Sequence, residues 1–307
     1  MKVFIAETYQ CNLDLMEWHL CITHDDNNYL ELELMELGNE DKRWILEMIL
    51  KNKIKEIVSR PEHIPGIYNY CDRWCDRCDK THACTNFAIG VSQFPDPDSN
   101  DPHSAKFWNQ LDEVFKATIE MLQEMADVQG VDLSAIDLDA AEVEDKHLIA
   151  VAEDHICSKM SQSYIKLVNC WFGKNQSLFD HKCDELERLE AMDLPNTDPA
   201  EEVERLNDDI EVIRWYQTQI FVKLMRAVEG VEMFSGEAES INDSDGSAKV
   251  ALLAVERSTA AWADLRRSFP TQADEILDIL IFLQRLCKKI EEFFPNARSF
   301  IRPGFDD

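Results

Sequence analysis

Four of the ten cysteines in this 307-residue chain lie within a stretch of fourteen residues. They are Cys71, Cys75, Cys78 and Cys84, and their spacing is C-x3-C-x2-C-x5-C. Thiols this close can pair as disulfides, hold a zinc ion, hold an iron–sulfur cluster or stay free. Structural zinc sites usually take two ligand pairs separated by a longer insert, whereas iron–sulfur clusters use compact cysteine runs. The spacing therefore favours an iron–sulfur cluster of the 4Fe-4S type, with zinc as the alternative.

The expected compartment bears on this choice. The residues from Met1 to Glu7 contain no long apolar stretch and reach an acidic residue at once, unlike a secretory signal. We therefore expect a cytoplasmic protein, in which disulfides are disfavoured and clustered cysteines more often bind metal. His82 lies inside the cluster, and we expect it to be a loop histidine facing water rather than a ligand.

Two smaller patterns inside the cluster resemble those of known iron–sulfur enzymes. Cys71, Cys75 and Cys78 have the spacing of radical-SAM enzymes, which fold as β/α barrels and usually carry an aromatic residue before the third cysteine. Here that residue is Arg77, and no alternation of strands and helices follows. The spacing from Cys75 to Cys84 is similar to the iron–sulfur arm of RecB-like nucleases, whose fold needs a sheet that this sequence does not predict. Neither pattern extends beyond the cysteines, so neither predicts a reaction.

Further candidate functional side chains lie in the second half of the chain. Arg257 shares a predicted helix face with small residues, so we expect it to be buried beside a carboxylate or a ligand cavity. The candidate partners are Asp208, Glu211 and Glu153. Gln217 lies on the apolar face of another predicted helix, where it needs a hydrogen-bond partner. Three cations of that helix are expected to reach the surface along their aliphatic stems: Arg214, Lys223 and Arg226.

Composition limits the classes of function. Sixty acidic residues against thirty-one basic ones give a formal net charge of −29, which repels phosphate backbones and disfavours bulk nucleic-acid binding. The chain contains no run of eighteen apolar residues, so no membrane span is predicted. The chain contains no P-loop, nucleophile elbow or dinucleotide fingerprint, so it predicts no catalytic residue. These patterns are compatible with a protein partner, and they do not predict the oligomeric state.

The elements that must position the cysteines are predicted to be helices, because only nine glycines and ten prolines interrupt the chain. Residues 29–34 alternate like a strand, but Leu, Glu and Met are helix formers, and we favour helix there. A helix is also expected over residues 41–59, ended by Pro61.

The stretch 93–104, rich in Pro, Asp and Ser, is the expected boundary between two parts. These are an N-terminal helical part with the cysteine segment (1–92) and a helical bundle body with a C-terminal tail (103–307). Helices in the body are expected over about 103–128, 142–171 and on to 191, 198–228, 247–267 and 270–294. Residues 230–246 are predicted to form a polar loop, with a helix cap at Asp245 or Ser247. The predicted fold class is all-α, a multi-helix bundle with an N-terminal cysteine-cluster segment.

Four groups of residues along the chain carry a further resemblance. They are Tyr70 through Cys78, Trp215-Tyr216-Gln217 with Lys223, Asp245 through Val250 with Glu256-Arg257-Ser258, and Arg302-Pro303-Gly304-Phe305. In these groups the chain resembles a family of uncharacterised bacterial all-helical proteins with a C-x3-C-x2-C-x5-C cluster. The resemblance implies the helical fold and the cluster, and it implies no mechanism.

The local geometry of the cluster follows from helical spacing. A helical turn would place Cys71, Cys75 and Cys78 on one face, with Cys84 returning to close the set. The intervening Asp and Arg side chains are expected to face water, and Trp74 to pack beside the site. Two functions fit this expectation: a metal-binding helical protein with a structural or redox role, or an acidic interaction module with zinc or no metal and no catalysis.

Overall fold

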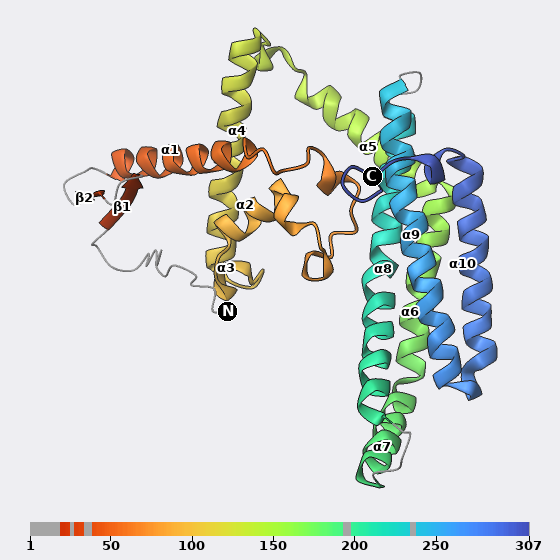
Figure 1. The fold of residues 1–307 in the computed structure, drawn as a ribbon. Coiled ribbons are helices and arrows are strands. Elements are labelled where there is room, and N and C mark those ends of the chain that lie inside the picture. Colours follow the sequence, from red (N-terminus) through yellow and green to blue (C-terminus); the bar gives the residue numbers. More distant parts are fainter. Residues whose placement is uncertain (1–18, 25–27, 34–38, 193–197, 234–237, 307) are drawn as a thin grey trace. The chain divides into compact units, whose positions relative to one another are not determined.

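The computed structural model describes residues 19–24, 28–33, 39–192, 198–233 and 238–306. In these ranges the protein has an all-α, multi-helix fold, as the scarcity of glycine and proline predicts (Figure 1). The helices are α1 (Asn39–Val58), α2 (Thr85–Gln93), α3 (Pro97–Asn100), α4 (Ala105–Gln129), α5 (Leu138–Asp154), α6 (Ile156–Lys174), α7 (Gln176–Met192), α8 (Pro199–Met233), α9 (Ala238–Ser268) and α10 (Ala273–Phe293).

A short antiparallel hairpin precedes the helices. Its strands are β1 (His19–His24) and β2 (Asn28–Glu33), with Ile22 opposite Leu30. The helix expected over residues 29–34 is therefore wrong for residues 29–33. The alternation of apolar and acidic residues, which has the period of a strand, outweighs the weaker helix propensity of the individual residues.

The chain divides into two compact units. The first comprises Met1–Arg60 and Ile89–Val131, and the second comprises Pro61–Ala88 and Asp132–Asp307. The cysteine segment thus groups with the bundle, whereas the boundary expected at residues 93–104 falls inside the first unit.

In the first unit, α1 and α4 are joined by ion pairs. Glu124 of α4 accepts from Lys51 Nζ at 3.2 Å and from Lys55 Nζ at 2.9 Å. The helix expected from about residue 103 is confirmed as α4, where the Ser104 side chain accepts from the Lys106 amide as an N-cap. Gly130 ends α4 in the left-handed conformation, with φ of 71°.

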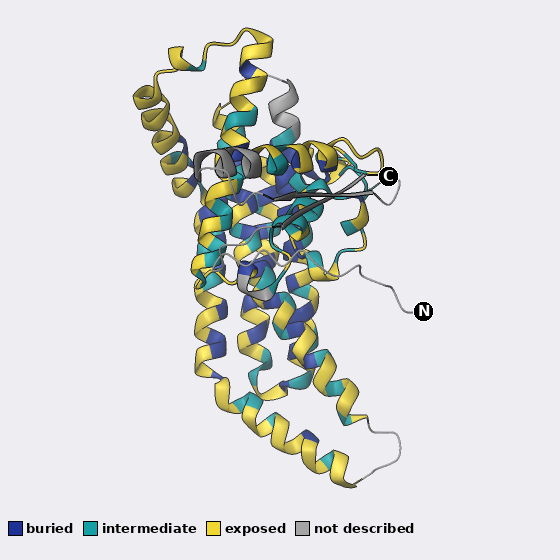
Figure 2. Ribbon diagram, turned by 90° about the vertical axis from the view of Figure 1, so that its left-hand side faces the viewer, coloured by how far each residue is buried: buried dark blue, intermediate teal, exposed yellow. Residues whose placement is uncertain are grey.

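In the second unit, α6, α8, α9 and α10 pack together into a bundle (Figure 1). Their inward faces carry the buried residues, as Figure 2 shows. At the centre, the fully buried Trp262 donates its indole N–H to the Tyr164 hydroxyl at 3.0 Å and meets Trp171 edge to face at 4.9 Å. The apolar stripes of the sequence are the physical origin of this core.

Helix ends in the bundle follow side-chain capping. The continuous helix expected from residue 142 past 171 is interrupted at His155, whose ring accepts from the Cys157 amide at 3.3 Å and so begins α6. Asp198 caps α8 as predicted, because its carboxylate accepts from the Glu201 amide at 2.9 Å.

The polar loop expected over residues 230–246 is wrong over 230–233, which belong to α8, and over 238–246, which belong to α9. Residues 234–237 lie outside the described residues. Asp245 and Ser247 lie inside that helix and are buried, so neither is its cap. The polar composition of this stretch reflects tertiary contacts: Asp243 accepts from the Tyr70 hydroxyl at 2.8 Å and pairs with Arg226 at 2.7 Å. Polar residues that meet partners are compatible with helix, and composition alone does not reveal the partners.

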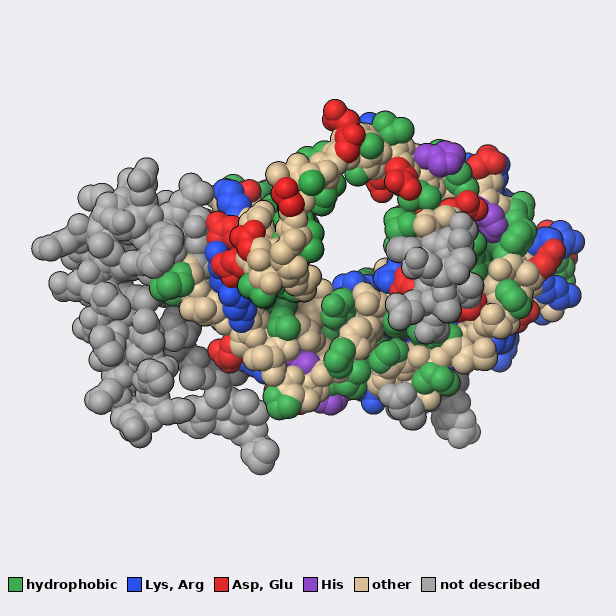
Figure 3. Space-filling model, turned by 90° about the horizontal axis from the view of Figure 1, so that it is seen from above, with side chains coloured by type: hydrophobic (Ala, Val, Ile, Leu, Met, Phe, Trp, Pro, Cys, Tyr) green, Lys and Arg blue, Asp and Glu red, His purple; other side chains and the backbone are tan. Residues whose placement is uncertain are grey.

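Residues 300–306 dock on the second unit. The Phe300 ring lies 4.7 Å from the Tyr70 ring, and Asp306 pairs with Lys249 at 2.7 Å and with Arg302 at 2.8 Å. None of the described helices is long and apolar enough to cross a membrane. On the face seen in Figure 3, acidic, basic and apolar side chains are interspersed.

Candidate functional site

The cysteine segment, residues 61–88, is irregular where a helical turn was expected. It contains three single-turn 3₁₀ helices, Ile67–Asn69, Cys75–Arg77 and Thr81–Ala83, before α2 begins. Between the first two, Arg73 adopts a left-handed backbone with φ of 60°, which L-residues other than glycine adopt uncommonly. The predicted helical turn through Cys71, Cys75 and Cys78 is therefore wrong.

The break has a local cause. The Asp72 carboxylate accepts from the Trp74 amide two residues on, at 3.2 Å. This short-range bond offers the backbone an alternative to helical hydrogen bonding. The chain therefore turns immediately after Cys71 instead of continuing as a helix.

All four cysteines nevertheless line a single cavity. Its volume is about 20 Å³, and its remaining wall is largely apolar, including Ile67, Trp74, Phe87 and Phe305. The four residues are free, half-buried thiols: Cys71, Cys75, Cys78 and Cys84. In the described part of the chain, no three His, Cys, Asp or Glu side chains form a ready-made group for a metal ion. His82 is exposed, as expected for a loop histidine facing water, and it does not line the cavity.

Backbone amides point at two of the sulfurs. The Lys80 amide donates to Cys78 Sγ at 3.4 Å, and the Phe87 amide donates to Cys84 Sγ at 3.5 Å. Burial, followed by the charges of the neighbouring cysteines, raises the pKa of Cys75. A negative charge on a neighbouring cysteine therefore disfavours ionisation of Cys75.

Asp72 is the main polar link between the segment and the bundle. Its carboxylate accepts from the Tyr216 hydroxyl at 2.6 Å and pairs with Arg257, and its carbonyl accepts from Trp215 Nε1 at 3.0 Å. The expectation that the Asp and Arg residues of the segment all face water is wrong for Asp72, whose side chain is 24% exposed. Trp74 packs beside the site as expected, stacked on Trp215 at 4.9 Å.

Arg257 does not lie where its sequence context predicts. Its side chain is 52% exposed rather than buried, and its partner is Asp72 rather than Asp208, Glu211 or Glu153. Its long side chain extends past the small residues of α9 and over the Tyr216 ring, at 5.4 Å from the centroid. Asp208 and Glu211 instead form ion pairs with Arg77. Gln217 is buried as predicted, and its Oε1 has no hydrogen-bond partner among the described residues.

The cations of α8 also depart from expectation. Lys223 is only 5% exposed, and its ammonium donates to the Asn69 carbonyl at 3.0 Å. Burial lowers the pKa of Lys223 to about 8. Arg214 is exposed as predicted, while Arg226 is half-buried and pairs with Asp243. The cysteine segment covers this part of α8, and a helix pattern cannot reveal such a cover.

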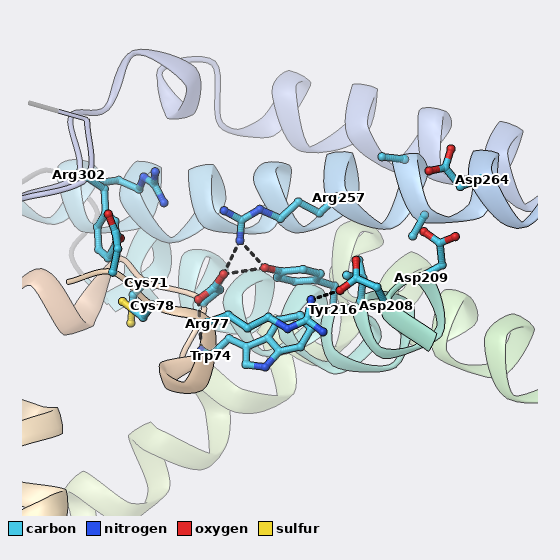
Figure 4. Close-up of a pocket in the computed structure, with 16 residues that line it drawn as sticks. Cys71, Trp74, Arg77, Cys78, Asp208, Asp209, Tyr216, Arg257, Asp264 and Arg302 are labelled. Carbon is cyan, nitrogen blue, oxygen red and sulfur yellow. Dashed lines mark hydrogen bonds and ion pairs between the residues drawn. The ribbon is translucent and has the colours of Figure 1, made fainter. Parts of the chain in front are cut away.

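A second cavity of about 490 Å³ adjoins the first (Figure 4). The two cavities share five wall residues: Cys71, Asp72, Trp74, Cys78 and Phe305. The rest of its wall comes mostly from α8 and α9, including Asp209, Tyr216, Arg257 and Asp264. Asp264 lies on the predicted helix face of Arg257, which was expected to border a carboxylate or a ligand cavity. Sequence patterns did not single out Asp209, because an isolated acidic residue on a helix does not show what packs against it.

Comparison with known proteins adds no further identification: no family model, curated protein or solved structure matches the chain. The resemblance to bacterial all-helical proteins stays a prediction.

Proposed function

We propose that the protein binds an iron–sulfur cluster through Cys71, Cys75, Cys78 and Cys84, in a structural or redox role. The observation that supports this is the gathering of all four thiols around one cavity by a segment without long regular elements. Contacts of Asn69, Asp72 and Arg77 with α8 hold this irregular segment, and supporting contacts of this kind fix the positions of ligand side chains.

The surroundings of the thiols fit such a group. Metal ligation requires thiolates, and a bound cation offsets the mutual repulsion of crowded thiolates. The amides of Lys80 and Phe87 already donate to sulfur, and hydrogen bonds of this type tune the reduction potential of iron–sulfur clusters. Lys223 places a buried ammonium against the same segment. When bound, the cluster would supply one-electron transfer or a rigid cross-link between four points of the segment.

This proposal implies a cytoplasmic, reducing environment, which keeps the thiols available for metal. Four thiolates can also complete a tetrahedral zinc site. One observation favours zinc: the cavity volume of about 20 Å³ suits a single ion. A zinc-bound or metal-free acidic module that binds another protein, without catalysis, is thus the second candidate.

The test is purification without oxygen, followed by measurement of iron, acid-labile sulfide and zinc and by a visible absorption spectrum. We expect about four irons and four sulfides per chain in the wild type. A Cys71→Ala, Cys75→Ala double variant should lose them. The matched control is Cys170→Ala, Cys183→Ala, which removes two exposed thiols outside the cavity and should leave the metal content unchanged. Stoichiometric zinc would support the alternative, and the absence of both metals would exclude a metal role for the cluster.

A further inference from the structure

The larger cavity has the dimensions of a ligand site. Its volume of about 490 Å³ lies within the range of roughly 300–1,000 Å³ that is typical of small-molecule pockets. Figure 4 shows Asp209 and Asp264 together at one end of it, away from Cys71 and Cys78. The cavity therefore reaches from the cysteine segment to an acidic end between α8 and α9.

The positive charges of the cavity wall are already neutralised. Each of its arginines has a carboxylate partner: Arg77 pairs with Asp208 and Glu211, Arg257 with Asp72, and Arg302 with Asp306. An anionic ligand would have to displace one of these partners. The wall thus offers no ready cation to an anion.

At the acidic end, in contrast, one carboxylate oxygen lacks a donor within the described ranges. The Asp209 side chain is 8% exposed, and its Oδ2 has no hydrogen-bond partner among the described residues. The ion-pairing distance to Arg205 Nη1 is long, at 3.9 Å, and Asp264 is held by Arg267. A buried carboxylate oxygen without a donor is costly, because buried polar atoms are normally hydrogen-bonded.

The surroundings of Asp209 also disfavour its ionised form. Burial, followed by the charge of Asp264, raises the pKa of Asp209 to about 7. The other charged groups that act on it are Arg205 and Asp208 of α8 and Arg267 of α9. A cation brought by a ligand would stabilise the ionised carboxylate that the protein alone leaves poorly matched.

We propose that this cavity binds a small organic cation with a primary ammonium group, which donates to Asp209. An ammonium supplies three N–H donors and a full charge, and charge-assisted bonds are stronger than neutral ones. Trp74, Val212 and Tyr216 line the same cavity and can contact the hydrocarbon part of such a ligand. The small side chains of Ala260 and Ala261 leave the space for it. The net charge of −29 also raises the local concentration of cations.

The test is titration calorimetry of the full-length protein at pH 8 with butylamine and 1,4-diaminobutane, and with 1-butanol as the uncharged analogue. We expect saturable binding of both amines, and binding of butanol weaker by about tenfold or more. Asp209→Asn should reduce amine affinity about tenfold or more, because it keeps the shape and removes the charge. Glu204→Gln is the matched control, since it removes an exposed charge from the same helix outside the cavity and should leave the affinity unchanged.

A second variant makes the test independent of charge. Ala260→Phe fills the cavity from an exposed position on α9 and should abolish amine binding while it leaves the Asp209 carboxylate in place. Amine affinity should also rise between pH 6 and pH 8, as Asp209 ionises. The proposal is overturned if neither amine binds the wild type up to about 10 mM. It is equally overturned if butanol binds as well as butylamine, or if Asp209→Asn or Ala260→Phe binds amines like the wild type.

Discussion

The cysteine segment and the helical bundle belong to one compact unit but are held in different ways. The bundle is held by apolar packing, with Trp262, Leu283 and Ile220 almost inaccessible to solvent. The segment has only single-turn helices before α2, and polar contacts from Asn69, Asp72 and Arg77 attach it to α8 and α9. Packing within the bundle therefore stabilises the bundle itself, whereas the conformation of the segment depends on its contacts with the bundle.

This difference predicts which residues stabilise both regions and which hold only the segment that carries the candidate site. Residues that hold the core should affect both regions when changed, and residues that anchor the segment should affect the segment alone. Five substitutions, in four experiments, test the two regions, and we take them in order of decreasing expected effect on the free energy of unfolding.

Trp262→Ala should have the largest effect. It removes the most bulky fully buried side chain and its hydrogen bond to Tyr164, and such truncations cost about 3–5 kcal/mol. Urea denaturation followed by circular dichroism measures the loss. The control is Trp108→Ala, whose side chain is largely exposed and whose loss should cost less than about 1 kcal/mol. Equal stabilities of the two variants would show that the bundle core does not carry the fold.

Asp209→Asn should raise stability in a pH-dependent way. The pKa of Asp209 is about 7 in the folded protein against an ordinary value of 3.8. The wild type therefore has its full stability from this group below about pH 4 and loses it as the pH rises through 7. The variant has no such loss, so it should match the wild type at pH 4 and exceed it by about 2–4 kcal/mol at pH 8. Thermal unfolding at both pH values checks this, and a constant difference across the range would contradict it.

Asp72→Asn should loosen the segment while leaving the bundle intact. It removes the ion pair with Arg257 and weakens the bond from Tyr216, a loss of about 1–3 kcal/mol for the docked segment. Hydrogen exchange should become faster for the amides of residues 67–84 and stay slow in α8. Asp76→Asn, an exposed change in the same segment, is the control and should leave exchange unaltered. Faster exchange throughout α8 would mean that the two regions are not separable.

Gly246→Ala and Gly173→Ala should have opposite, smaller effects. A Cβ at Gly246 would lie 2.4 Å from Tyr70 Cε1 and 2.7 Å from Phe300 Cζ, whereas a Cβ at Gly173 meets nothing within 4 Å. Alanine stabilises a helix interior by about 1 kcal/mol relative to glycine, and we expect a smaller gain of the same sign at Gly173, which lies in the last turn of α6. At Gly246 the crowding should outweigh this and destabilise the protein by about 1–2 kcal/mol. Chemical denaturation of both variants measures the contrast, and the same sign for both would refute it.

The sequence predicts the long helices better than the site. The helices α4 and α8 could be predicted because long apolar stripes and the caps Ser104 and Asp198 are local signals. The cysteine cluster could be located because its spacing is local as well. The hairpin β1–β2 and the start of α9 could not be predicted, since there local propensity and composition pointed the other way.

The anchors of the site could not be predicted for a different reason. Asp72 and Lys223 meet partners 144 and 154 residues away. Helical periodicity shows which face of α8 is covered, but it does not show that the cover is a polar segment rather than another helix. The position of Arg257 could not be predicted for the same reason, because its partner Asp72 lies 185 residues earlier.

These long separations also set an order of events during synthesis. The cysteines are made first, and the α8 and α9 residues that anchor them follow 131 to 185 residues later. At roughly 5–20 residues per second, that interval lasts about 7–37 s. During it the four thiols belong to a chain whose docking surface does not yet exist. For the metal site that we propose, this interval would give a metal donor its most open access to the thiols, and completion of α9 would close it.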